Sequence, residues 1–250
     1  MKKVKAFTIA EILIVLGTIG IIAQMTLPEL IKDTQKIFYV TQLKKAYSNL
    51  NSAFKLYMLD QGTNDFEATD LFTSRNFNEL NKYFKIIKTC TNAGDTACSI
   101  AEKHLTGTDA GNIFVPSGLL DSIVFYTVDG MCIHLTLQDQ CNTDMTKSSK
   151  VKGICAYMHV DTNGIKGPNT YGRDLFYLGV AHDGSIFAFS SMDYGKYYTP
   201  NGLDWRTSVY YWDNGGTLWQ CGVSGSPDLT WVSGSGCAAR IIEENWEMNY

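Results

Sequence analysis

The sequence lacks the short motifs that most classes of enzyme require. It contains no G-x-S-x-G, no G-x-G-x-x-G and no P-loop. None of its cysteines is arranged as C-x-x-C, which argues against zinc ribbons and thioredoxin-type sites. His134 and His159 fall in strand-like stretches near cysteines, so a Cys–His pair could meet in space, but two strand histidines without a catalytic role are the simpler interpretation. His104 and His182 complete the four histidines, which form no H-E-x-x-H pattern. We therefore expect no enzymatic active site.

Basic charge is also scarce. The chain has 250 residues and a formal net charge of −4, so it has no broad positive field to neutralise phosphates, and nucleic-acid binding is not indicated. The basic residues Lys2, Lys3 and Lys5 form a local group in front of an apolar run. A chain of this length can bury a substantial core in one or two domains.

The apolar run from Phe7 to Leu27 contains a single charged residue, Glu11. As a helix it spans roughly 30 Å, the thickness of a bilayer's hydrocarbon core. The lysines before it favour a single-pass protein of the inner (cytoplasmic) membrane, with the N-terminus cytoplasmic and the remainder outside. An ordinary signal peptide fits poorly, because the run is long, contains an acid and is followed by no A-x-A-like site. A plain signal anchor stays open.

Apolar residues continue beyond Pro28 in steps of three and four, which predicts one stripe of an amphipathic helix. Pro28 removes a backbone donor and predicts a kink in a helix that continues to about residue 59. The stripe comprises Tyr39, Leu43, Ala46, Tyr47, Leu50, Phe54 and Tyr57.

The start of the apolar run carries a family resemblance. A short basic leader, a small residue and then Phe-Thr-x-x-Glu, here Ala6-Phe7-Thr8-Ile9-Ala10-Glu11, resembles the type IV prepilin signature, and the residues up to Leu27-Pro28 extend the match. The resemblance implies that a prepilin peptidase cuts between Ala6 and Phe7 and that the new amine of Phe7 is N-methylated. It also implies that the helix is kept and joins other pilin or pseudopilin subunits in a filament. Ala6 departs from the glycine most common in the family, but alanine is also small, so cleavage should survive.

Glu11 has two interpretations. An ionised carboxylate within lipid costs several kcal/mol unless it finds a partner. The resemblance implies that this partner is the mature N-terminal amine of a neighbouring subunit, so that the pair sets the axial register of assembly. Alternatively, Glu11 is a first-turn acid that the helix dipole favours near the lipid headgroups. The surrounding motif favours assembly.

The remainder of the chain predicts an α+β domain. Asp129-Gly130 and Asp183-Gly184 are strong hairpin signals between strand-like segments. A further strand is expected from Cys155 to Val160, and a short helix around Phe77 to Ile87. The amphipathic helix then covers an antiparallel sheet, as in pilin-like proteins.

The expected organisation is therefore a prepilin leader (1–6), a transmembrane or filament-core helix (7–28), its amphipathic continuation (29–59) and a globular extracytoplasmic α+β domain (60–250) with a loop-rich C-terminal region.

The segment "VDTNGIKGPNTYGRDLF", residues 160–176, gathers oxygen ligands of the kind that calcium takes. They belong to Asp161, Asn163, Asn169 and Asp174. The spacing is not that of an EF-hand, and Asn-Gly and Gly-Pro-Asn are also ordinary turn chemistry, which we favour over a calcium site. No other cofactor is expected. The stretch resembles one that recurs in bacterial proteins labelled type II secretion or prepilin-like, and this favours a pseudopilin over an adhesive pilin.

The seven cysteines all follow the apolar run and resemble disulfide partners in an oxidising compartment. The predicted local pairs are Cys90–Cys98 and Cys221–Cys237. Pairing among the other three stays open, with one of them left free. These three are Cys132, Cys141 and Cys155.

Tyrosine and tryptophan are concentrated in the last sixty residues. They could form a glycan-binding or protein-binding surface, which would make the chain a membrane-anchored binding module rather than a filament subunit. A small satellite core under long loops is the favoured alternative. The residues are Tyr194, Tyr197, Tyr198, Trp205, Tyr210, Tyr211, Trp212, Trp219 and Trp231.

Overall fold

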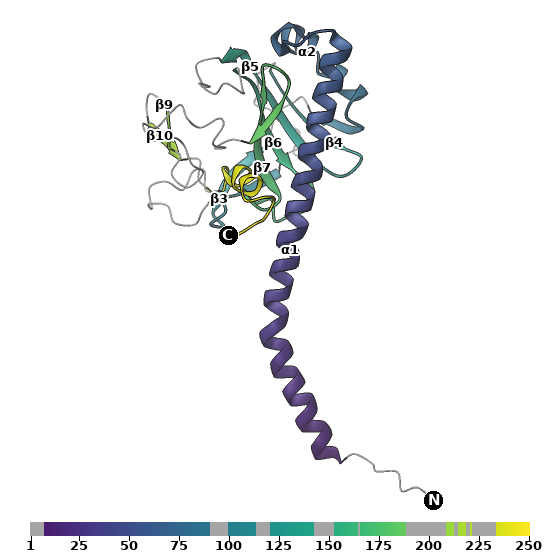
Figure 1. Ribbon diagram of the computed structural model, residues 1–250, viewed down its shortest axis with the longest axis vertical. Coiled ribbons are helices and arrows are strands. Elements are labelled where there is room, and N and C mark those ends of the chain that lie inside the picture. The colour runs from purple at the N-terminus through teal and green to yellow at the C-terminus, as the bar shows by residue number, and fades with distance from the viewer. Residues whose placement is uncertain are drawn as a thin grey trace, which may run out of the picture. The chain divides into compact units, whose positions relative to one another are not determined.

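The computed structural model describes residues 8–90, 100–113, 121–142, 153–164, 166–188, 209–212, 215–218, 221 and 234–250. The chain divides into two compact units, Met1–Phe38 and Tyr39–Tyr250. The predicted fold class is confirmed: a 53-residue helix, α1, precedes an antiparallel sheet of six strands (Figure 1).

The helices are α1 (Ile9–Gln61), the short 3₁₀ helices η1 (Phe66–Ala68) and η2 (Phe77–Lys82), α2 (Asp70–Ser74) and α4 (Cys237–Glu243). The six-stranded sheet has the order β1-β4-β5-β6-β7-β8, and every neighbouring pair is antiparallel. Its strands are β1 (Ile86–Cys90), β4 (Ser122–Thr127), β5 (Cys132–Asn142), β6 (Ile154–Asp161), β7 (Leu175–Ala181) and β8 (Ile186–Ala188). Two further pairs are β2 (Ile100–Lys103) with β3 (Asp109–Ile113), and β9 (Val209–Trp212) with β10 (Gly215–Leu218).

From Ile9 to Leu27, the first part of α1 carries apolar side chains on every side. It is the one helix among the described residues that is long and apolar enough to cross a membrane, and its most hydrophobic 18-residue window has no buried residue. The helix continues through Pro28 without interruption.

The second part of α1 buries one face against the sheet, as the spacing of its apolar residues predicts. Five residues of the predicted stripe are buried, and Tyr39 and Tyr47 are partly buried against the same core. Alternate residues of the central strands face this helix, among them Phe125, Ile133 and Met158. The stripe therefore decides which face of the helix is buried, and the alternating apolar residues of the strands decide which side of the sheet it covers.

The same helix also protects the edge strand β8. The Tyr47 hydroxyl donates a hydrogen bond to the Ile186 carbonyl at 2.8 Å, and the Ile186 N–H donates to Asn51 Oδ1 at 3.1 Å. An edge strand with free backbone groups is a template for wrong pairing, and these side chains occupy both groups of one residue.

Both predicted hairpins are present, as β4–β5 and β7–β8, but the helix expected around Phe77 to Ile87 is only partly right. A 3₁₀ helix ends at Lys82, and Ile86 already belongs to β1. The helix ends early because Phe84 packs against Phe125, with ring centroids 5.4 Å apart. This contact brings the residues after Phe84 beside β4. Tertiary packing thus overrides local helical preference here.

Candidate functional site

The N-terminal end of α1 is closed by a capping box formed by Thr8 and Glu11. The Thr8 N–H and its hydroxyl each donate to Glu11 Oε2 at 2.8 Å, and the Glu11 N–H donates to Thr8 Oγ1 at 3.2 Å. Thr8 is the N-cap and Glu11 the third helical residue, so two otherwise unsatisfied backbone donors are paired. This geometry supports the first-turn interpretation of Glu11 in the single chain, and it leaves the pairing with a neighbour's amine as a prediction.

The predicted cleavage and methylation site, Ala6 and Phe7, lies outside the described residues, which begin at Thr8. The helix after the cap presents an apolar surface with no protein cover. Gly17 and Gly20 have no atom within 4 Å of where a Cβ would stand, apart from the helix itself. This surface can pack against lipid or against further copies of the same helix.

The loop after β6 brings together the four residues predicted as calcium ligands. The Asn163 side chain donates to Asp174 Oδ2 at 3.2 Å, and the Asn169 N–H donates to the same oxygen at 2.9 Å. The Asn163 N–H donates to Asp161 Oδ1 at 3.0 Å, and the Asn169 amide, turned to donate, reaches Asp161 Oδ2 at 3.2 Å. Thr170 supplies a further N–H to Asp174 Oδ1 at 2.7 Å. The carboxylate oxygens therefore accept hydrogen bonds from the loop itself.

Asp161 and Asp174 are fully buried, and their electrostatics reflect it. Burial, together with the neighbouring Asp174 carboxylate, raises the pKa of Asp161 to about 8. Burial also raises the pKa of Asp174, although the hydrogen bonds from Thr170 and Asn169 oppose the shift. Glu102 on β2 is 7% exposed, and burial raises its pKa to about 7. Three acids are thus held together where ionisation is unfavourable.

The like charges of Asp161, Asp174 and Glu102 would repel one another if all three were ionised. A bound calcium ion or protonation of the acids would relieve this repulsion. The geometry therefore fits both the ordinary turn that the sequence favours and the alternative of a calcium site. Glu102 was not identified from the sequence, because no sequence pattern connects it with residues 161–174. In the structure the two segments are joined by the Lys103 N–H, which donates a hydrogen bond to the Asn169 carbonyl at 2.9 Å.

The face of the sheet opposite α1 carries His134, His159 and Cys132. His134 and His159 are paired across β5 and β6, with ring centroids 5.6 Å apart, and His159 Nδ1 lies 2.7 Å from the Tyr171 hydroxyl. Burial lowers the pKa of His134 to about 4 and that of His159 to about 3. Cys132, two residues before His134, is a buried free cysteine, and burial raises the pKa of its thiol to about 12. The thiol therefore stays protonated at neutral pH, which is unsuited to nucleophilic chemistry.

Disulfides join Cys141 to Cys155 and Cys221 to Cys237. The second is the pair predicted from its local spacing, and the first leaves Cys132 free among the three cysteines whose pairing was open. Cys90 is also disulfide-bonded, and Cys98, its predicted partner, lies outside the described residues.

The aromatic region lies largely outside the described residues. Tyr194, Tyr197, Tyr198, Trp205, Trp219 and Trp231 lie there, and Tyr210, Tyr211 and Trp212 are described only as part of strand β9. The described residues therefore do not test whether these aromatic side chains form a binding surface.

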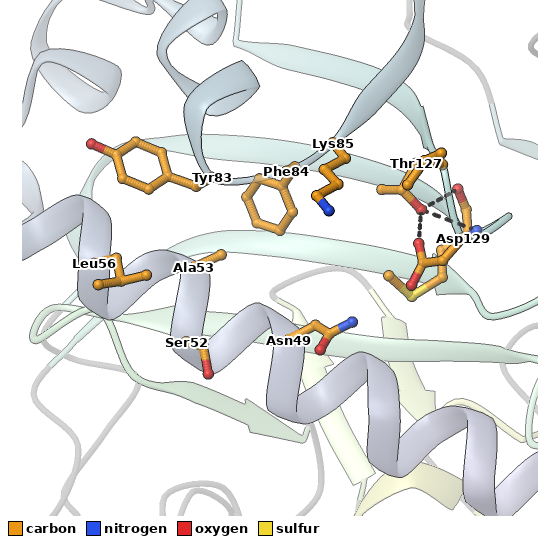
Figure 2. Close-up of a pocket in the computed structure, with 11 residues that line it drawn as sticks. Asn49, Ser52, Ala53, Leu56, Tyr83, Phe84, Lys85, Thr127 and Asp129 are labelled. Carbon is orange, nitrogen blue, oxygen red and sulfur yellow. Dashed lines mark hydrogen bonds between the residues drawn. The ribbon is translucent and has the colours of Figure 1, made fainter.

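A groove of about 370 Å³ lies between the second part of α1 and the β4–β5 turn (Figure 2). Leu56 from the helix and Val128 from the turn line it, and both are more than half exposed. Asp129 at its end is paired with Lys45 at 3.0 Å. No residue predicted as a site from the sequence lines this groove.

No protein-family model matches this chain, and neither the curated proteins nor the solved structures compared with it give a significant match. The pilin-like character of the architecture therefore stands on the long apolar N-terminal helix and on the packing of its second part against an antiparallel sheet.

Proposed function

We propose that this chain is a non-enzymatic structural subunit of a type IV pilus-like filament, of the type II secretion pseudopilin kind. Prepilin peptidase removes residues 1–6, Phe7 is methylated, and the subunit waits in the inner membrane until its N-terminal helix joins those of other subunits. The observation that carries the proposal is the uncovered first part of α1, in which every large apolar side chain of residues 9–31 is about half exposed or more. Such a surface must be covered by lipid or by neighbouring helices.

The architecture supports a retained N-terminal helix over a secretory signal peptide that is removed. A secretory signal peptide is removed, so it does not pack against the mature domain. In contrast, α1 is one continuous helix, and its second part packs in the core of the domain. The choice of a pseudopilin over an adhesive pilin rests on the resemblance carried by residues 160–176.

Assembly is tested by changing Glu11. In the proposed filament the Glu11 carboxylate gives up its hydrogen bonds with Thr8 and pairs with the N-terminal amine of a neighbouring subunit. The Glu11→Ala variant should therefore be inserted into the membrane and cleaved normally, but it should fail to enter filaments. Glu29→Ala, an exposed acid on the same helix, is the matched control and should assemble. Incorporation is measured by recovering filaments and quantifying the variant subunit in them.

Thr8→Ala separates the two roles of Glu11. It removes the hydroxyl of the capping box but keeps the carboxylate. If Glu11 acts only as a cap, Thr8→Ala and Glu11→Ala will reduce incorporation equally. Normal incorporation of Glu11→Ala would refute the pairing role.

A further inference from the structure

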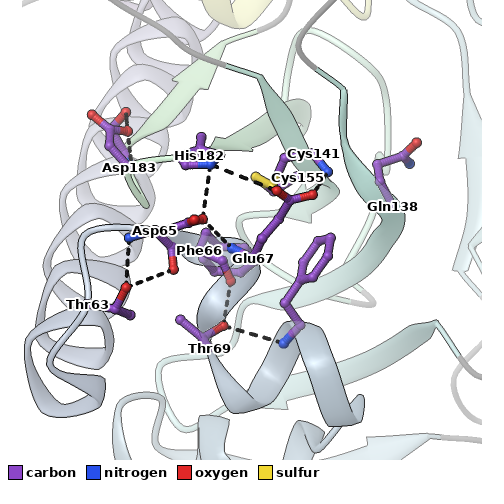
Figure 3. The surroundings of a disulfide bond; sticks show 12 residues. Thr63, Asp65, Phe66, Glu67, Thr69, Gln138, Cys141, Cys155, His182 and Asp183 are labelled. Atoms are coloured by element: carbon purple, nitrogen blue, oxygen red, sulfur yellow. Dashed lines mark hydrogen bonds and ion pairs between the residues drawn. A yellow bond between two sulfur atoms is a disulfide. The ribbon is translucent and has the colours of Figure 1, made fainter.

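Three metal-ligating side chains from distant parts of the chain meet beside the Cys141–Cys155 disulfide (Figure 3). Asp65 and Glu67 follow α1, and His182 lies in the turn between β7 and β8. His182 Nε2 is 3.0 Å from Asp65 Oδ1 and 3.9 Å from Glu67 Oε2, and one ligand atom from each residue lies within 4.8 Å of the other two. The sequence gives no sign of this cluster, because more than a hundred residues separate its two parts.

The backbone holds the two segments in place independently of these side chains. The Phe66 N–H donates to the His182 carbonyl at 2.8 Å, so the residue between the two acids is bonded to the residue that carries the imidazole. The Glu67 N–H donates to Asp65 Oδ1 at 2.9 Å, and the Cys141 N–H donates to Glu67 Oε1. These bonds orient both carboxylates and leave Glu67 Oε2 directed toward the imidazole. Ligands held by such outer hydrogen bonds are typical of metal sites.

Two of the three ligand separations are close to those of tetrahedral zinc. Bonds of about 2.0–2.1 Å at tetrahedral angles place neighbouring ligand atoms about 3.4 Å apart. The observed separations of 3.0 and 3.9 Å lie on either side of that value. The third separation, between the carboxylate oxygens of Asp65 and Glu67, is within 4.8 Å, so side-chain rotations would be needed to bring all three ligands to one ion.

The charge and the donor types point to the same ion. In the part of the chain that the structure describes, no lysine or arginine pairs with Asp65 or Glu67, so two carboxylates face one imidazole. Calcium and magnesium prefer all-oxygen sites, whereas a mixed nitrogen and oxygen set suits zinc. The three side chains are partly exposed, with 28% of His182 accessible, which gives water access to a fourth position.

We propose that Asp65, Glu67 and His182 form a Zn²⁺ site that fastens the segment after α1 to the β7–β8 turn. Zn²⁺ binds His182 through an unprotonated Nε2, so the proton shared with Asp65 is released to water, and a water molecule completes the coordination. The site is independent of the filament role, because no atom of it lies in the apolar part of α1.

The test uses the full-length protein in detergent, treated with a chelator and kept without reductant. Titration with ZnCl₂ should show one saturable site and raise the midpoint of thermal unfolding, and MgCl₂ at the same concentration should not. CoCl₂ in place of zinc should give the visible absorption of a tetrahedral site. His182→Ala and Glu67→Gln should each weaken zinc binding by more than about 100-fold, since each removes a direct ligand.

Asp70→Asn is the matched control, an exposed acid three residues from Glu67 that should bind zinc like the unaltered protein. Circular dichroism establishes that each variant is folded, which we expect because the Phe66–His182 bond is between main chains. Zinc affinity unchanged in both ligand variants would overturn the site. If a variant does not fold, the unaltered protein decides: no saturable zinc binding, or cobalt absorption without tetrahedral bands, would equally overturn it.

Discussion

The two parts of α1 are equally helical and similarly rich in apolar residues, but they bury them differently. From Ile9 to Leu27 large apolar side chains are exposed on all sides, whereas around Leu50 one face is buried and the other carries polar residues. An all-round apolar surface indicates a nonpolar solvent or many identical neighbours, and a one-sided stripe indicates a single packing partner. The distribution of apolar residues, more than their number, therefore separates the part proposed for the membrane or filament from the part that holds the domain together.

The largest effect should come from matched leucine truncations in the two parts. Leu50 is fully buried and Leu30 is 64% exposed. Leu50→Ala should lower the free energy of unfolding of the domain by about 2–5 kcal/mol, because a buried leucine leaves a cavity. Leu30→Ala should leave it unchanged within about 0.5 kcal/mol. Denaturant unfolding of both variants in the same detergent measures this, and equal destabilisation would erase the distinction between the two parts.

Removing the Cys141–Cys155 disulfide should have the next largest effect, and only on the domain. The bond closes a loop with a sequence separation of 14, so a Cys141→Ala, Cys155→Ala double variant should lose about 3 kcal/mol. Membrane insertion of the N-terminal helix should not change. Thermal unfolding with and without reductant checks the result. A midpoint that the double variant and the reductant both leave unchanged would show that the bond does not contribute to stability.

The buried acids make domain stability depend on pH. The pKa of Glu102 rises from its ordinary 4.5 to about 7 in the folded state. Between these values the folded protein keeps a proton that the unfolded chain has released, so stability falls as pH rises and is lowest above about pH 7. Asp161 extends this fall toward its pKa of about 8.

His134 and His159 act in the opposite direction below their ordinary pKa of 6.5, because burial lowers their pKa and the unfolded chain binds the protons instead. The effect of the buried acids on stability is therefore best measured between about pH 6.5 and 9, where the histidines no longer oppose it. Glu102→Gln should be more stable than the unaltered protein at pH 8 by about 1–3 kcal/mol and should show a shallower pH dependence, measured by unfolding in chelator. Parallel pH profiles for the two proteins would contradict the raised pKa.

Calcium should have the smallest effect. Because the loop donates hydrogen bonds to both carboxylates, we expect millimolar calcium to leave the unfolding midpoint unchanged. Gly164→Val should instead destabilise the domain, because φ is +69° there and a Cβ would stand 2.7 Å from the Gly130 carbonyl oxygen. A midpoint that rises with calcium and no longer does so in an Asp161→Ala, Asp174→Ala variant would establish the metal site.

Periodic patterns made much of the fold predictable. The stripe through Leu50, the Asp129-Gly130 turn and the Asp183-Gly184 turn all depend on residues close in sequence, and each has the predicted structure. The Thr8–Glu11 cap was not predicted, although its two residues are three apart and fit the Thr-x-x-Glu pattern of a capping box.

Contacts between distant segments were not predictable in this way. Nothing local connects Glu102 with Asp161, or Asp65 with His182, and the strand beginning at Ile86 forms because Phe84 packs on Phe125. Such groups meet only through the sheet topology, which one sequence does not encode in a short pattern.

The most direct test of the filament reading is the N-terminus of the protein recovered from membranes. Cleavage between Ala6 and Phe7 is what distinguishes a prepilin from a plain membrane anchor, since both would keep the apolar part of α1. Mass spectrometry of the N-terminal peptide should find Phe7 as the first residue, carrying a methyl group on its amine. An intact N-terminus beginning at Met1 would contradict the account.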